Sequence, residues 1–102
     1  MHLVEILLPV RDAEGRPFPR AHYDDLAHGL IERFGGLTAH SRAPAAGLWK
    51  EDSGATQRDD IVVYEVMVDR LDAEWWSQYR RRLEARFAQK ELVVHAQEIR
   101  RL

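Results

Sequence analysis

The apolar residues of this chain fall into short blocks whose spacing changes along the sequence. Residues 3–10 are an apolar run rich in branched side chains, too short for a helix and ended by Pro9 and a polar segment. Such a run predicts a β-strand. Residues 37–42, 61–68 and 92–99 predict three further strands, from their alternation or their content of β-branched residues.

Two segments instead have the three- and four-residue spacing of an amphipathic helix. The first follows Pro19 and ends at Gly35-Gly36, and the second begins at the N-cap residue Asp72 and runs to about Gln89. The apolar face of the first helix comprises Tyr23, Leu26, Ala27, Leu30, Ile31 and Phe34. That of the second comprises Trp76, Tyr79, Leu83 and Phe87.

The order strand, helix, strand, strand, helix, strand predicts a single α+β domain over residues 1–102. We expect a ferredoxin-like βαββαβ fold, with a four-stranded antiparallel sheet in the order 4-1-3-2 and both helices on one face. Residues 43–60 predict an irregular connection between the second and third strands, because they contain Pro44 and the turn signal Asp52-Ser53-Gly54.

The strands carry apolar residues on both faces of the predicted sheet. Val4, Ile6 and Leu8 are expected to face the helices. The opposite face would still carry Leu3, Leu7, Ile61, Val63, Met67, Val93 and Ile99. Because an apolar patch of that extent usually marks an interface, we predict a homodimer formed through the open sheet face.

Polar residues interrupt that predicted patch at Glu5, Glu65 and His95. Pairing Ile6 with the middle of the third and fourth strands brings Glu5 opposite the other two, and His40 can join from the second strand. Two carboxylates beside an imidazole can perform acid–base chemistry, so these are the candidate catalytic residues. The alternative is a polar network that only fixes the register of the dimer.

A second candidate site lies in the loops at one end of the sheet. Arg11, Arg16 and Trp49 meet there beside the start of the first helix, where arginine side chains and free N–H groups favour anions. Acidic residues share these loops, so the alternative is local ion pairing.

Composition narrows the classes of function. The 102 residues have a net charge of −2 and no cysteine, which argues against a nucleic-acid partner, an anionic membrane, a disulfide framework and a thiolate metal site. No signal peptide and no apolar run of membrane-spanning length appears, so we expect a cytoplasmic protein. No phosphate loop, HExxH or GxSxG motif appears, and we predict neither a cofactor nor a metal.

With its elements placed, the chain resembles the ferredoxin-like fold and, within it, the dimeric α+β barrel proteins, which pack two such sheets face to face. Residues 32–38 followed by Gly47-Leu48-Trp49 also resemble small uncharacterised bacterial proteins. The barrel proteins include cofactor-independent monooxygenases, isomerases, haem-degrading enzymes and stress proteins, so the resemblance implies a fold without assigning an activity or a catalytic residue.

Three hypotheses therefore remain open. The first is a homodimer that binds a small, largely apolar ligand between its sheets. The second is a cofactor-independent acid–base enzyme of the isomerase or monooxygenase type. The third is a structural or interaction module with a dry interface.

Overall fold

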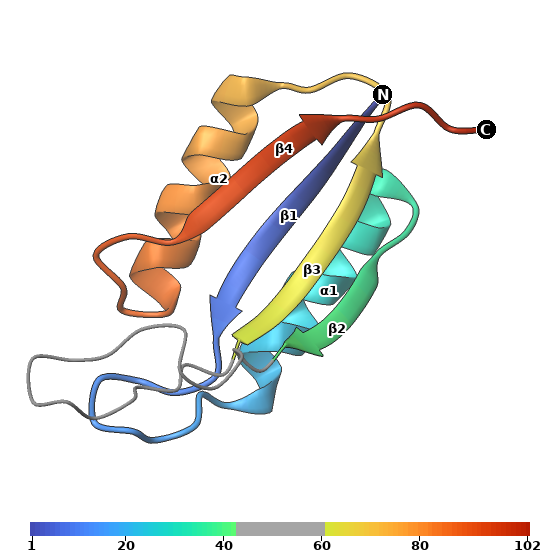
Figure 1. The fold of residues 1–102 in the computed structure, drawn as a ribbon. Coiled ribbons are helices and arrows are strands. Elements are labelled where there is room, and N and C mark those ends of the chain that lie inside the picture. Colours follow the sequence, from blue (N-terminus) through green and yellow to red (C-terminus); the bar gives the residue numbers. More distant parts are fainter. Residues whose placement is uncertain (43–60) are drawn as a thin grey trace, which may run out of the picture.

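The computed structural model describes residues 1–42 and 61–102, and its centre is an antiparallel sheet (Figure 1). Its strands lie in the order β2-β3-β1-β4, and each neighbouring pair is antiparallel. Read from the other edge, this order is the predicted 4-1-3-2, so the ferredoxin-like fold is confirmed. The strands are β1 (His2–Pro9), β2 (Thr38–Arg42), β3 (Ile61–Val68) and β4 (Val93–Glu98).

Two helices, α1 (Arg20–Phe34) and α2 (Ala73–Arg86), cover one face of the sheet and leave the other open (Figure 1). The predicted caps are confirmed at Gly35, which has φ 85° and donates its N–H to Ile31, and at Asp72, which accepts the N–H of Trp75. In the described part of the chain, no helix is long and apolar enough to span a membrane.

The sequence placed the end of α2 three residues too late, at Gln89. The helix ends at Arg86, and Ala88 adopts φ 50° just beyond it. A residue in that left-handed region interrupts the helical hydrogen-bond pattern, as glycine does at many helix ends. No strand boundary differs from the predicted one by more than one residue, and those of β3 are as predicted.

Side chains from β1 occupy the middle of the core, where Val4, Ile6 and Leu8 are buried as predicted. Leu26 and Leu30 of α1 pack on them, together with residues of the predicted face of α2, of which Trp76, Leu83 and Phe87 are buried. Ile31, which was predicted to lie on the apolar face of α1, is 46% exposed. Each helical residue is rotated by about 100° from the one before, so the residue after Leu30 lies at the flank of the buried face.

An aromatic cluster joins the end of α1 to the start of α2. The Phe34 ring stacks on Trp76 at 5.2 Å between centroids, and Trp75 stacks on Tyr79 at 4.9 Å. The guanidinium of Arg33 lies over the Trp75 ring, 4.2 Å from its centroid. Burial raises the pKa of Tyr79 to about 12, although Arg82 and Arg86 act to lower it. The Tyr79 ring therefore remains a neutral part of this packing at physiological pH.

The turn from α2 into β4 is held by Glu84. Its Oε2 accepts the backbone N–H of Leu92 at 2.9 Å and a guanidinium N–H of Arg80 at 2.8 Å. The hydrogen bond from Leu92 and the contact with Arg80 lower the pKa of Glu84, because both favour the ionised carboxylate.

Replacing Glu84 by Gln should lower the melting temperature at pH 7 by a few degrees, because the ionised form that the fold favours is lost. A depressed folded-state pKa contributes stability above the unfolded value, here 4.5, and that contribution disappears as pH falls through the folded value. The gap between wild type and Glu84→Gln should therefore close in acid. Thermal unfolding from pH 7 to pH 2 measures it.

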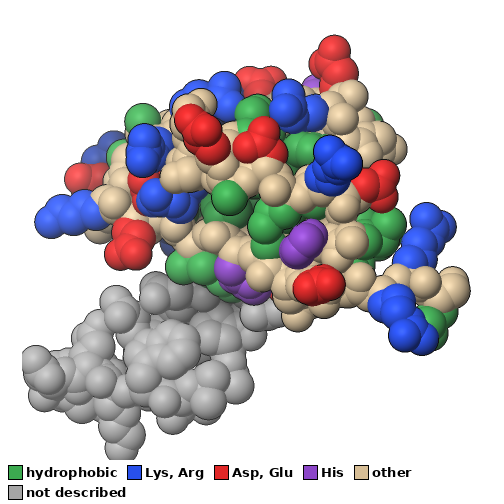
Figure 2. All heavy atoms as spheres, turned by 90° about the horizontal axis from the view of Figure 1, so that it is seen from above, with side chains coloured by type: hydrophobic (Ala, Val, Ile, Leu, Met, Phe, Trp, Pro, Cys, Tyr) green, Lys and Arg blue, Asp and Glu red, His purple; other side chains and the backbone are tan. Residues whose placement is uncertain are grey.

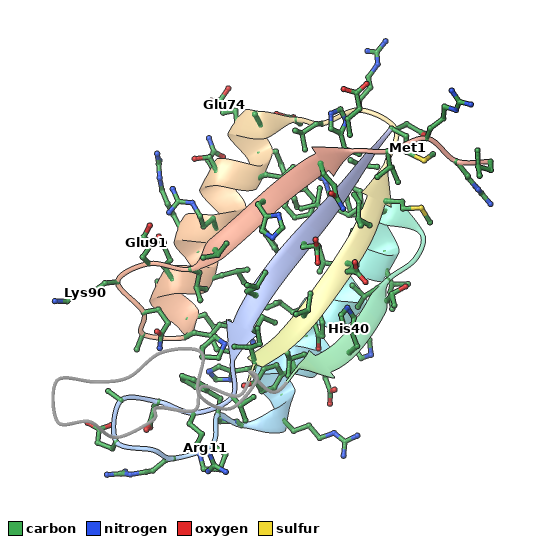
Figure 3. The ribbon with its side chains drawn as sticks, viewed as in Figure 1. Met1, Arg11, His40, Glu74, Lys90 and Glu91 are labelled. Carbon is green, nitrogen blue, oxygen red and sulfur yellow. The ribbon has the colours of Figure 1, made fainter. Side chains whose placement is uncertain are left out.

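Glu91→Gln is the matched control, since Glu91 is exposed and points away from the sheet (Figure 3). The control should have the same melting temperature as wild type at each pH. An equal effect of both substitutions would contradict the assigned role of Glu84.

Candidate functional site on the open sheet face

The register of the sheet brings the predicted acidic residues together on the open face. Glu5 of β1 lies opposite Glu65 of β3 and, on its other side, opposite His95 of β4. The prediction of this cross-strand row is confirmed. It follows from the pairing of Ile6 with both Tyr64 and Val94, which holds the core in register.

His40 of β2 lies opposite Val63 in the register and reaches Glu65 diagonally across the open face. Ala39 pairs with Tyr64 on the core side, so the next residue, His40, points to the open face (Figure 3). Its Nε2 lies 2.9 Å from Oε1 of Glu65, in hydrogen-bonding contact. On the other side of the row, Nε2 of His95 lies 4.0 Å from Oε1 of Glu5. We call His95, Glu5, Glu65 and His40, one from each strand, the polar stripe.

The carboxylates of the polar stripe are more enclosed than its imidazoles. The Glu5 and Glu65 side chains are 15% and 24% exposed, against 51% for His95 and 41% for His40. The two acids lie on the central strands and the histidines on the edge strands. A ligand approaching the open face would therefore meet two central carboxylates flanked by two imidazoles.

Apolar side chains lie on both sides of the polar stripe. Leu3 and Met67 pair in the row on one side, while Leu7, Val63 and Val93 form the row on the other. Met67 and Val93 are about half-exposed, as predicted for an open face. Val63 is fully buried, which was not expected of a residue on that face. The exposed apolar surface is therefore smaller than the sequence predicted.

Chemically, the His40–Glu65 contact is a carboxylate–imidazole pair that can pass a proton to or from a ligand on the open face. The direction depends on the ring tautomer, because the same nitrogen can donate to or accept from a neighbour. Across residues 1–42 and 61–102, no three side chains of the metal-ligating types His, Cys, Asp or Glu lie close enough to hold a metal ion.

The second predicted site is not brought together with the polar stripe. Arg11 lies beyond the end of β1 that is remote from Met1 (Figure 3), and its guanidinium donates to the carbonyl of Gly15 within its own loop. The Asp12 carboxylate closes that loop by accepting the backbone N–H of Arg16 at 2.8 Å. In the described residues neither arginine forms an ion pair. Trp49 lies outside those residues.

A groove at the opposite end of the sheet, open to solvent and about 720 Å³ in volume, was not predicted from the sequence. It runs from Glu65 past Met67 to the end of α1, and three arginines line it: Arg33, Arg70 and Arg101. These arginines are far apart in sequence, so no local pattern linked them. The glycine pair at positions 35–36 was the available signal, because it marks where α1 turns back toward the sheet.

Comparison with known proteins gives a similarity of fold. No protein-family model matches the chain, and no curated protein matches it in sequence. A solved phage SAM lyase in complex with S-methyl-5′-thioadenosine is similar, with a TM-score of 0.57 and 14% identity over 95% of this chain and 80% of that one. The phage SAM lyase in its apo state has a TM-score of 0.61 and 12% identity, over 95% and 79% of the two chains.

The His40–Glu65 contact should show a measurable coupling energy. In a double-mutant cycle of His40→Ala and Glu65→Gln, we expect about 0.2–1 kcal/mol in the free energy of unfolding, because the pair is partly exposed and screened by water. The His95→Ala and Glu5→Gln cycle should give less, since those atoms are 4.0 Å apart. Urea denaturation measures both cycles, and a stronger coupling in the second pair would contradict this geometry.

Proposed function

We propose that two copies of this chain pack open face to open face and bind a small, largely apolar ligand around the polar stripe. The observation that carries the proposal is the composition of this face, where half-exposed Met67 and Val93 flank a row of ionisable residues. Apolar surface favours association, and the ionisable row gives the enclosed space specific polar groups.

Two-fold symmetry suits this arrangement, because a dimer around such an axis uses the same patch on both copies. In that dimer the polar stripe of one chain faces the polar stripe of the other chain, or a ligand held between them. Four carboxylates and four imidazoles, two of each from each copy, would share the enclosed space, and opposite charges can pair across it. A ligand with a cationic or hydrogen-bonding centre would fit against Glu5 and Glu65.

A second candidate function is acid–base catalysis on such a ligand. The 2.9 Å contact between His40 and Glu65 favours it, since an imidazole oriented by a carboxylate is a common general base. The similar phage SAM lyase acts on a compound with a cationic sulfonium centre, and a central pair of carboxylates suits a centre of that charge. We therefore choose S-adenosylmethionine and S-methyl-5′-thioadenosine as the first ligands to test.

Association through the open face predicts a sedimentation mass near twice 11.9 kDa at micromolar concentration. Met67→Glu should shift the protein toward the monomer, because it places an unpaired charge in a desolvated contact. Ile31→Glu is the matched control: Ile31 is 46% exposed on α1, against 53% for Met67, and lies on the covered side of the sheet. It should leave the mass unchanged.

A wild-type monomer would overturn the proposed assembly. So would dissociation by Ile31→Glu with no effect of Met67→Glu, which would place the contact on the helices. Circular dichroism of each variant confirms that the fold is retained.

Ligand binding at the polar stripe predicts that S-adenosylmethionine raises the melting temperature and shifts the NMR signals of His40 and His95. Glu5→Gln should weaken binding by roughly tenfold, because it removes one of the charges facing a cationic centre. The neutral thioether S-methyl-5′-thioadenosine tests the contribution of the charge. Chromatography of the same mixtures detects turnover.

Shifts without turnover would support the binding function and argue against the enzyme. A dimer with no response to either compound would exclude both as ligands of the polar stripe and count against the second candidate function.

A further inference from the structure

The groove at the end of α1 has a different chemical character from the polar stripe. Its apolar lining comes from Leu3, Phe34, Leu37, Met67 and Val68. Its volume of about 720 Å³ falls within the roughly 300–1,000 Å³ typical of small-molecule sites. The groove is formed by one copy of the chain.

The charged groups around this apolar lining are mostly basic. Arg33, Arg70 and Arg101 line the groove, against the acids Glu65 and Asp69. Three guanidinium groups against two carboxylates leave the lining with an excess of positive charge. Among the described residues no carboxylate lies within 4.0 Å of the guanidinium groups of these three arginines.

Two features of the fold position Arg33 and the C-terminal segment that carries Arg101. The Arg33 guanidinium lies over the Trp75 ring, and this cation–π contact restrains a planar group whose N–H donors can bind a carboxylate in pairs. At the other side, the N–H of Ile99 donates to the carbonyl of Met1 at 3.0 Å, which keeps the C-terminal residues beside the start of β1. Figure 2 shows basic side chains projecting at that end of the molecule.

We infer that this groove binds a small molecule with an apolar body and a single negative charge, such as a medium-chain carboxylate. The body lies along Leu3 and Met67, and the carboxylate lies at the arginine end. Neither part of the lining is sufficient alone, because the apolar wall is short and the arginines are exposed to water. This site goes beyond the proposed function, which concerns the polar stripe.

Octanoate, below its micelle concentration, is the probe. In ¹⁵N NMR it should cause saturable shifts in the amide signals of Leu37, Met67 and Arg70. Octanamide has the same chain without the charge, and acetate has the charge without the chain, so each should bind at least tenfold more weakly. Equal affinity of octanamide would show a purely apolar contact, equal affinity of acetate a purely ionic one, and either result would overturn the inference.

The double substitution Arg70→Gln and Arg101→Gln should weaken octanoate binding roughly tenfold, the combined effect of two partly exposed ion pairs. Arg81→Gln with Arg82→Gln changes the net charge equally on the exposed side of α2 and should leave the affinity unchanged. Equal weakening by both pairs, shifts confined to other parts of the chain, or no binding by the wild type would overturn the inference. Sedimentation of the same samples measures the oligomeric state separately, so the absence of a dimer can be distinguished from the absence of octanoate binding.

Discussion

The alternation of side chains along β1 is the constraint on which the core, the open face and the polar stripe all depend. β1 pairs with a strand on each side, so one register serves both ladders. Ile6 lies opposite Tyr64 and Val94 on the core side, and Glu5 necessarily points the other way. A slip of one residue would turn Glu5 into the core, where an unpaired carboxylate is strongly unfavourable. The packing of the core thereby fixes the geometry of the candidate site.

Packing does not explain why that position is acidic. Like charges directly opposite each other destabilise an antiparallel pair, and Glu5 and Glu65 are such neighbours. Threonine or valine at either position would favour the sheet more strongly. The nearby imidazoles of His40 and His95 offset part of the repulsion when they are protonated. Local choices that oppose stability are concentrated at functional sites, which is the physical argument for placing a ligand here.

The features of the fold that depend on strand or helix periodicity could be predicted from the sequence. The element order, the inward face of β1, the caps at Gly35 and Asp72, and the row from Glu5 to His95 all follow from spacings of two or of three to four residues. Periodicity gives the face on which a side chain lies, but not what fraction of it stays exposed after the helices and strands pack together. The exposure of Ile31 and the burial of Val63 were therefore predicted wrongly.

The groove was missed for a related reason. It depends on three segments that meet only in the folded chain, namely the end of α1, the residues after β3 and the C-terminal residues beside Met1. The contact of Ile99 with Met1 and the contact of Arg33 with Trp75 are both long-range, and neither has a signature in a window of neighbouring residues. Arginine side chains are common on protein surfaces, so the sequence indicated only that these three residues are exposed to solvent.

Glu65 connects the two parts of the molecule, because it contacts His40 in the polar stripe and also lines the groove. The body of a ligand in the groove would lie on Leu3 and Met67, which belong to the open face that we propose as the interface. Such a ligand would change the apolar surface that a second copy meets. Groove occupancy and self-association would then be coupled, with the same free energy in both directions. A substitution at Glu65 alters both sites together, whereas substitutions at Glu5 and at Arg70 act on one site each and can separate them.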